Sequence, residues 1–285
     1  MTDDTNMSPF VKSPDWLKDH LTDENIRIVD ASWFLPAQNR NAKEEYAQNH
    51  IPGAVFFDQD SIIDEQSSLP HALPEPHNFG QRVGELGISE EHVIVVYDAL
   101  GMFTAPRVWW MFKTMGAENV FVLDGGFDNW KSNGLLVTND TVAHPSVEFT
   151  PYFDKDAVAN IDDVLAATDD EGTELLDARG AGRFTGEEAE PREGMRSGHM
   201  PGAKNTPVFG FSDNGKLKPL NELKDIFESK SVDLNKKIIT TCGSGVTAAV
   251  ITLALNSIGK TDVQLYDGSW SEWGARQDTP VETGE

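Results

Sequence analysis

The sequence predicts an α/β protein made of two tandem domains, each a parallel sheet flanked by helices. Short apolar segments alternate with helical ones, which is typical of parallel sheets that are covered on both faces. The 285-residue chain also repeats itself with a period of about 145 residues. A chain of this length is long for one domain and sufficient for two. We therefore expect a duplicated domain.

The repeat rests on four pairs of matching segments that occur in the same order in both halves. We expect the first domain over residues 8–138, a polar linker over 139–160 and the second domain over 161–285. The pairs are 26–31 with 174–179, 50–54 with 199–203, 93–98 with 237–242, and 123–130 with 266–273.

Individual elements follow from local patterns. Proline near its start predicts a helix over 106–115, and apolar spacing predicts another over 220–229. Within the first of these helices, Trp109 and Trp110 are expected to fill the core and the domain interface. His50 and His199 occupy matching positions of the two repeats, so we expect them to fix a turn rather than to act in catalysis.

Composition excludes several classes of function. The formal net charge of −24 argues against a nucleic-acid surface, which needs a basic stripe. The chain has no apolar run that approaches the roughly 18 residues of a membrane span, and its first residues are acidic, so we expect neither membrane insertion nor a targeting peptide. One cysteine fits a reducing compartment, and we expect a cytoplasmic protein. Any site for a small anion must be a local cluster of arginines.

The one cysteine, Cys242, stands between a β-branched strand pattern and a helical one that begins near Ala248. In a strand, tight loop and helix, backbone N–H groups converge near the helix N-terminus, where they favour a thiolate over a thiol. The alternative is that Cys242 is a small buried hydrophobe. Gly243 and Gly245 favour an exposed loop instead. The first copy carries Asp98 at this position, which cannot act as a sulfur nucleophile.

The remaining motifs argue against other chemistry. A cysteine phosphatase needs an arginine near the end of the loop, but Ala248 stands six residues after Cys242 and no arginine follows before Arg276. No phosphate-binding glycine motif is present, and the histidines lack the spacing of metal ligands. We therefore expect neither a cofactor nor a metal.

The duplicated architecture, the two His-x-Pro-Gly-Ala segments and the Cys-x4-Thr loop resemble the two-domain rhodanese sulfurtransferases. The loop Cys242-Gly243-Ser244-Gly245-Val246-Thr247 is similar to that of the 3-mercaptopyruvate sulfurtransferases, whereas thiosulfate-using relatives carry Arg and Lys after the cysteine. The resemblance covers nearly the whole chain. It implies two rhodanese-like domains and a cysteine that cycles through a persulfide.

The resemblance also implies site residues. Arg183 and Arg192 match positions that hold the substrate carboxylate and ketone, a task that suits a permanently charged guanidinium. The residues themselves allow another interpretation, in which both are solvated charges that balance nearby glutamates. Asp60 and His71, eleven residues apart, match a pair that is proposed to align with Ser244 for proton transfer. A structural role for His71 is the alternative.

These observations predict a sulfurtransferase that takes sulfur from 3-mercaptopyruvate. The loop residues Gly243, Gly245, Val246 and Thr247 would bind the transferred sulfur, and a thiol, cyanide or thioredoxin would accept it. Gly243 and Ser244 supply no cation, which favours a monoanionic donor over the thiosulfate dianion. A thiosulfate sulfurtransferase and a non-enzymatic sulfur-relay module are the alternatives.

Overall fold

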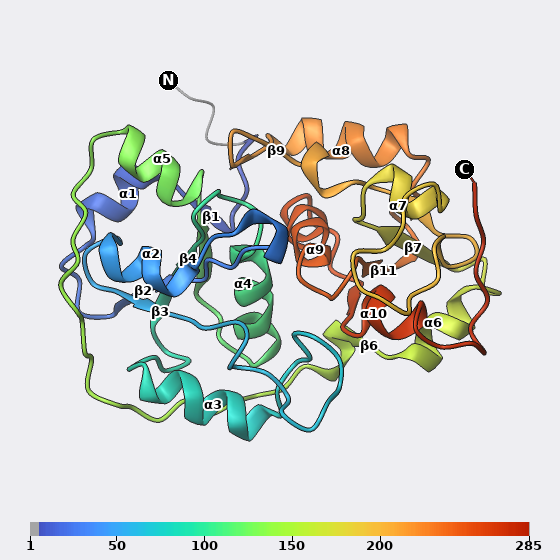
Figure 1. Ribbon diagram of the computed structural model, residues 1–285. Coiled ribbons are helices and arrows are strands. Elements are labelled where there is room, and N and C mark those ends of the chain that lie inside the picture. Colours follow the sequence, from blue (N-terminus) through green and yellow to red (C-terminus); the bar gives the residue numbers. More distant parts are fainter. Residues whose placement is uncertain (1–5, 285) are drawn as a thin grey trace.

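The computed structural model describes residues 6–284, which form two domains side by side (Figure 1). The first domain has a five-stranded parallel sheet in the order β1-β5-β4-β2-β3. Its strands are β1 (Val11–Lys12), β2 (Ile26–Asp30), β3 (Ala54–Phe56), β4 (Val93–Tyr97) and β5 (Val120–Leu123), and its helices are α1 (Pro14–Asp19), η2 (Pro36–Gln38), α2 (Ala42–Gln48), α3 (Pro76–Glu85), α4 (Ala105–Thr114) and α5 (Gly126–Ser132).

The second domain repeats this design. Its parallel sheet has the order β6-β12-β11-β7-β8, which is the first order with each strand replaced by its counterpart. The elements are η3 (Lys155–Ala157), β6 (Val158–Ala159), α6 (Ile161–Ala167), β7 (Thr173–Asp177), α7 (Ala181–Thr185), β8 (Lys204–Asn205), η4 (Val208–Gly210), the hairpin β9 (Ser212–Asp213) and β10 (Lys216–Leu217), α8 (Leu220–Ser229), β11 (Lys237–Thr241), α9 (Ala248–Ser257), β12 (Val263–Tyr266) and α10 (Ser269–Trp273).

The α/β fold and its duplication are therefore confirmed, and the helix predictions agree with the structure. Helix α4 begins at Ala105 with Pro106 in its first turn, where a missing N–H costs no hydrogen bond. Helix α8 has the expected bounds of 220–229. Nδ1 of His50 lies 2.7 Å from Tyr46 O, four residues earlier, which agrees with a role in a turn. Nδ1 of His199 lies 2.9 Å from Phe184 O, so this histidine ties its segment to α7 instead.

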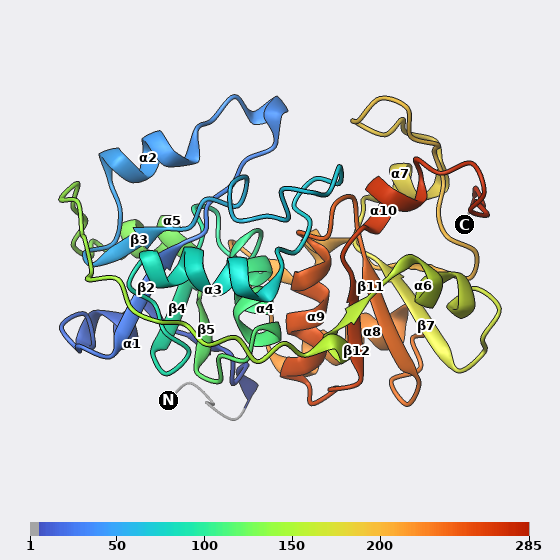
Figure 2. The ribbon, with the colours of Figure 1, turned by 90° about the horizontal axis from the view of Figure 1, so that it is seen from below.

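The segment after α5 runs along the outside of the first domain, past α3, before it enters the second domain (Figure 2). Val147 N donates to Gly84 O, and a side chain at Gly84 would collide with the Val147 carbonyl. This close approach explains a glycine inside α3, where glycine otherwise weakens a helix. The predicted linker over 139–160 includes β6, which pairs with β12. Val158 and Ala159 therefore belong to the second sheet.

The two domains meet where α4 packs against α9 (Figure 2). Trp109 and Trp110 are buried there as expected, in an apolar core that continues into the second domain. Phe103 stacks on Phe209 across the interface, with ring centroids 6.1 Å apart. Both helices begin directly after loops at the carboxyl ends of their sheets, so this packing brings the two loops together.

No helix among residues 6–284 combines the length and the apolarity that a crossing of the bilayer requires.

One aspartate occurs at the same position in both domains, but its charged partners differ. Asp30 is buried at the end of β2, and burial raises its pKa to about 6. Its counterpart Asp177, at the end of β7, accepts hydrogen bonds from the buried guanidinium of Arg179 at 2.6–3.0 Å. The first copy has Ser32 where the second has Arg179, so the charge of Asp30 lacks this compensation.

We predict that Asp30→Asn stabilises the protein above pH 6. The raised pKa means that the contribution of Asp30 to stability is most favourable where the group is protonated in both states, below about pH 4, and is lost as the pH rises through about 6. Asparagine does not ionise, so the gain should reach about 1–3 kcal/mol at pH 7 and vanish near pH 4. Urea unfolding at several pH values measures it.

The matched variant is Asp177→Asn, which leaves buried Arg179 with a weaker partner. It should destabilise the protein by about 3 kcal/mol at pH 7. Equal effects of the two variants on the free energy of unfolding would contradict the assigned difference in charge compensation.

Candidate active site

Cys242 directly follows β11, the central strand of the second sheet. Its side chain is buried with 1% of the residue exposed, which corrects the expectation of an exposed loop. The reason is tertiary: the first domain covers the carboxyl end of the sheet, and Cys242 belongs to the core that both domains share. The backbone is fixed on the other side by α10, because Cys242 N donates to Ser269 Oγ at 3.1 Å and Trp270 N donates to Cys242 O at 3.0 Å.

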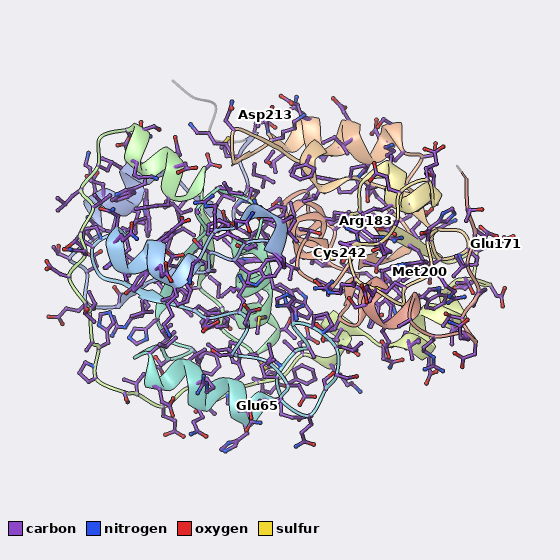
Figure 3. The ribbon with its side chains drawn as sticks, in the orientation of Figure 1. Glu65, Glu171, Arg183, Met200, Asp213 and Cys242 are labelled. Atoms are coloured by element: carbon purple, nitrogen blue, oxygen red, sulfur yellow. The ribbon has the colours of Figure 1, made fainter. Side chains whose placement is uncertain are left out.

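The glycines of the loop serve close packing rather than exposure. A methyl group at Gly243 would lie 3.1 Å from Nη2 of Arg183, so the guanidinium rests against the loop next to the cysteine (Figure 3). Gly245 has a φ of +77°, which favours glycine, and a side chain there would approach the Asp267 carbonyl within 2.8 Å. Val246 is buried, and Thr247 is the N-cap residue of α9.

The first copy shows what such a loop binds. Asp98, at the position of Cys242, turns its carboxylate toward the start of α4. Its Oδ2 accepts N–H groups of Phe103, Thr104 and Ala105 at 2.7–3.0 Å, and Oδ1 accepts that of Gly101. The first domain therefore fills its own loop with an anion, which is what converging amides at a helix N-terminus favour.

Arg183 and Arg192 both lie at the Cys242 loop of the second domain. Arg192 Nη1 donates to Ser271 Oγ at 3.3 Å, and that hydroxyl donates to Gly243 O at 2.6 Å. Burial and then the positive charge of Arg183 lower the pKa of Arg192, whereas the negative charge available at Cys242 raises it. Two guanidinium groups close enough to repel each other form a site for an anion.

Glu190 organises these charges. Its buried carboxylate pairs with Arg183, whose Nε donates to Oε1 at 3.2 Å, and with Arg179 at 2.8 Å. Arg183 is thus held by one buried glutamate rather than solvated among several. From the sequence, Glu190 was expected only as one of the nearby glutamates that balance the arginines, and Ser271 was not predicted. The repeat offered one indication of a polar residue at this position, since the first copy has Asp128 there.

His71 reaches the site from the first domain. Its Nδ1 lies 3.4 Å from Gln59 O and 3.7 Å from Asp60 Oδ1, and its ring packs edge-on against Trp33. Because a carbonyl oxygen only accepts, the first contact assigns the proton to Nδ1 and leaves Nε2 free to accept one. Burial lowers the pKa of His71, and the charges of Arg107 and Arg192 act in the same direction, while Gln59 and Asp60 oppose them. His71 is therefore neutral at pH 7.

Asp60 and Ser244 are less tightly connected. Asp60 is largely exposed and accepts from Trp33 Nε1 at 3.0 Å, and its distance to His71 exceeds a hydrogen bond. Ser244 is buried in the cysteine loop. Within the described part of the chain, no hydrogen bond joins Ser244 to His71. The structure thus brings Arg192 into electrostatic range of both His71 and Cys242, and it leaves the Ser244–His71 contact unmade.

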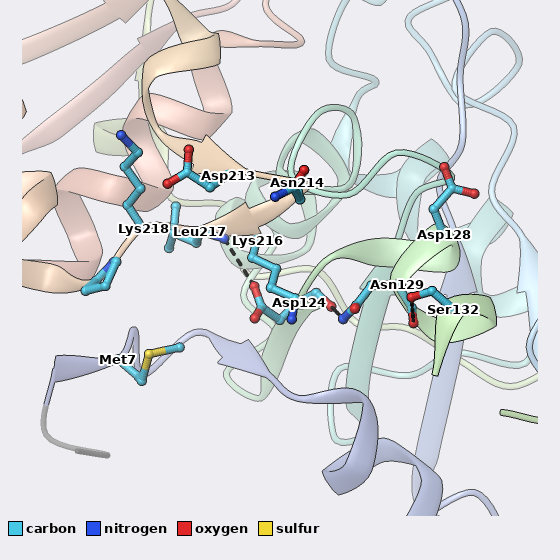
Figure 4. A pocket seen from close by; sticks show the side chains of 11 residues that line it. Met7, Asp124, Asp128, Asn129, Ser132, Asp213, Asn214, Lys216, Leu217 and Lys218 are labelled. Atoms are coloured by element: carbon cyan, nitrogen blue, oxygen red, sulfur yellow. Dashed lines mark hydrogen bonds between the residues drawn. The ribbon is translucent and has the colours of Figure 1, made fainter. Parts of the chain in front are cut away.

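Other features lie apart from this site. Among residues 6–284, no group of three or more metal-ligating side chains could hold an ion. A cavity of about 660 Å³ lies between α5 and the β9–β10 hairpin, where Asp124 Oδ1 accepts from Leu217 N at 3.1 Å (Figure 4). None of the candidate site residues lines it. Its lining comprises Met7, Asp124, Asp128, Asn129, Ser132, Asp213, Asn214, Lys216, Leu217, Lys218 and Pro219.

Comparison with known proteins decides the family. The sequence profile of the rhodanese-like domain matches residues 13–133 and 160–276. The chain belongs to the rhodanese family. A rhodanese relative named 3-mercaptopyruvate sulfurtransferase from Escherichia coli K12 is 46% identical over 269 residues, which cover 94% of this chain and 96% of that protein.

Further rhodanese relatives carry two kinds of name. The human protein named 3-mercaptopyruvate sulfurtransferase is 40% identical over 87% of this chain and 84% of its own length. The rat thiosulfate sulfurtransferase is 42% identical over 91% and 88%. The crystal structure of the 3-mercaptopyruvate enzyme SseA from Escherichia coli matches 92% of this chain and 98% of that one, with 43% identity and a TM-score of 0.85. The chain is therefore a two-domain rhodanese with sulfurtransferase homologues.

We predict that Glu190→Gln destabilises the protein, because Arg179 and Arg183 lose their shared anionic partner in a buried setting. The expected loss in the free energy of unfolding is about 1–3 kcal/mol. Glu193→Gln, at an exposed position of the same loop, is the matched control and should change it by less than about 0.5 kcal/mol. Similar losses in both variants, measured by chemical denaturation, would refute the assigned role of Glu190.

Proposed function

We propose that this protein is a 3-mercaptopyruvate sulfurtransferase that carries the sulfur as a persulfide on Cys242. The observation that carries the proposal is the placement of Cys242 directly after β11, beside two arginines, Arg183 in α7 and Arg192 in the loop that follows α7. The relatives with this name, which align over nearly the whole chain, support the same substrate.

In the proposed reaction, Arg183 and Arg192 bind the carboxylate and ketone of 3-mercaptopyruvate next to Gly243. The Cys242 thiolate attacks the sulfur of the substrate. A sulfur–sulfur bond forms and the carbon–sulfur bond breaks, so that its electron pair leaves with carbon as the enolate of pyruvate. A proton then converts the enolate to pyruvate. In the first domain, amide N–H groups of the matching loop donate to the carboxylate of Asp98, which supports the idea that amides hold the persulfide.

Proton transfer is assigned to Ser244 and His71. A neutral His71 with Nε2 unprotonated can accept a proton, which fits a general base in the first step. Ser244 would connect the substrate to His71 once the ligand draws the two loops together, since hydrogen bonds at active sites often shorten only in the complex. Asp60 would orient His71 through its Nδ1 side.

The charges of the site favour a monoanionic donor. Gly243 and Ser244 bring no cation to the cysteine, and Glu190 offsets part of the charge of Arg183. Thiosulfate, a dianion, would be stabilised less than a carboxylate that both arginines hold. Thiosulfate is the second candidate because a thiosulfate sulfurtransferase is 42% identical to this chain. Turnover of both donors by the same preparation, with pyruvate and sulfide as the readout, discriminates them.

The acceptor and the compartment are part of this proposal. A small thiol, cyanide or reduced thioredoxin would attack the outer sulfur of the persulfide: a bond forms from the acceptor to that sulfur, the sulfur–sulfur bond breaks, and its electron pair regenerates the Cys242 thiolate. A thiol acceptor would leave as its own persulfide, and cyanide as thiocyanate. A single cysteine fits a reducing environment, so we place the reaction in the cytoplasm. A relay module that receives its persulfide from a partner would not release pyruvate from free 3-mercaptopyruvate.

We predict that Cys242→Ser abolishes turnover of 3-mercaptopyruvate, since a hydroxyl is a poor sulfur acceptor at neutral pH. Mass spectrometry of the wild-type protein after one equivalent of substrate should show one added sulfur atom, and the variant should show none. Substantial pyruvate release by Cys242→Ser would rule out the covalent route.

We also predict that Arg183→Ala and Arg192→Ala raise KM for 3-mercaptopyruvate by about ten- to hundredfold, because each removes a charge-assisted hydrogen bond to the carboxylate. Steady-state kinetics measure this. Arg276→Ala, an exposed arginine paired with Asp278, is the control and should leave KM unchanged. If KM in both site variants stays at the wild-type value, the carboxylate is bound elsewhere.

A further inference from the structure

One buried arginine connects the two halves of the site. Arg107 stands in the first turn of α4, in the first domain, and only 1% of it is exposed. Its Nη2 donates to His71 O at 2.8 Å and to Asp267 Oδ1 at 2.6 Å. Its Nη1 donates to Gly245 O at 3.4 Å. A single guanidinium therefore contacts the backbone of the proton-transfer histidine and the backbone of the cysteine loop.

Asp267 completes the connection from the second domain. It directly follows β12, and its second carboxylate oxygen accepts the N–H of Leu73 at 2.7 Å. The loop that carries His71 is thus held at two points, at the carbonyl of His71 by Arg107 and two residues later by Asp267. Charged hydrogen bonds in a buried setting are among the stronger ones, and the planar fork of arginine fixes their geometry.

The backbone that this pair holds is not relaxed. His71 has a φ of +58°, a left-handed conformation that non-glycine residues seldom adopt. Such conformations persist where neighbouring groups hold them in place. Gly245 follows Ser244 directly, so the contacts of Arg107 lie on His71 itself and next to its proposed partner.

The arrangement belongs to only one of the two copies. Asp124, the counterpart of Asp267, also accepts an N–H from the other domain, that of Leu217. The repeat places Val250 where the first copy has Arg107, so Asp124 receives no matching arginine from α9. An arginine therefore pairs with the aspartate on the side of the interface that carries the cysteine loop, and the equivalent aspartate, Asp124, has no such partner from α9.

We propose that Arg107 and Asp267 are positioning residues for sulfur transfer: their ion pair sets the placement of His71 relative to Ser244 across the domain interface. This inference rests on the proposed function. Arg107 touches neither substrate nor Cys242 and acts through the two loops. The charged groups that face His71 are Asp60, Arg107 and Arg192, so the pair also contributes one of the charges that keep His71 neutral.

The test uses Arg107→Gln, Arg107→Lys and Asp267→Asn in the full-length protein. For Arg107→Gln and Arg107→Lys we expect kcat for 3-mercaptopyruvate to fall by about ten- to hundredfold, the effect of a misplacement near 1 Å. KM should change by less than about threefold, because Arg183 and Arg192 keep the substrate carboxylate. Asp267→Asn, which retains an oxygen for Arg107, should give a smaller loss of kcat.

Titration of His71 by NMR separates charge from geometry. Arg107→Gln removes a cation and should raise the pKa of His71 toward its ordinary value, whereas Arg107→Lys keeps the cation and should leave it near that of wild type. Arg27→Lys is the matched control, since Arg27 also donates to backbone carbonyls, at the opposite end of its sheet. It should change neither kcat nor the titration.

Kinetic values are expressed per folded protein, taken as the fraction that elutes at the wild-type position in size-exclusion chromatography and unfolds cooperatively in urea, so that misfolded protein does not enter them. A normal kcat in folded Arg107→Gln would overturn the proposal, and so would a loss confined to KM. If the substitutions of Arg107 prevent folding, the kcat and KM of Asp267→Asn test the proposal by the same criteria. If the wild-type protein does not release pyruvate from 3-mercaptopyruvate, the proposed function fails, and an unmoved His71 titration in Arg107→Gln then overturns the positioning pair as well.

Discussion

The packing of α4 against α9 is the constraint on which the site depends. Each helix begins at the end of a loop that follows a central strand, so their contact across the domain interface brings the two loops together. Neither domain holds a complete site by itself. Cys242 and the two arginines that we propose to bind the substrate come from the second domain, and His71 comes from the first. The burial of Cys242 is a consequence of the same contact.

Duplication explains how two similar loops came to differ in chemistry. In the first copy the loop amides hydrogen-bond to Asp98, an anion that the chain itself supplies. In the second copy the equivalent position is a sulfur, with Arg183 and Arg192 beside it. Because the amide N–H groups of the first copy already donate to Asp98, they are not available to bind a ligand. The first domain therefore supports the second through its interface, where it contributes His71 and Arg107.

The strong acidity of the chain is compatible with an anionic substrate because the local charges differ from the global one. The net charge of −24 is spread over the molecule and is screened by salt. At the site, buried acids are paired with arginines, as Glu190 is with Arg179 and Arg183. Arg192 contacts Ser271 and belongs to no carboxylate pair among the described residues. In the proposed function, its positive charge provides the local attraction for the carboxylate of the substrate.

The sequence alone determined the α/β class, the duplication, the position of the cysteine loop and the two candidate arginines. The first three rest on local patterns and on a repeat whose members can be compared residue by residue, whereas the arginines came from the resemblance to a known family. It could not reveal that Cys242 is buried, because that depends on which surface the other domain covers. Nor could it show that Glu190 holds Arg183, or that Arg107 spans the interface to Gly245 and Asp267. Glu190 is one of several acids near Arg183 in the sequence, and Arg107 lies more than a hundred residues from Gly245 and Asp267, so packing selects each pair and only the tertiary structure decides it.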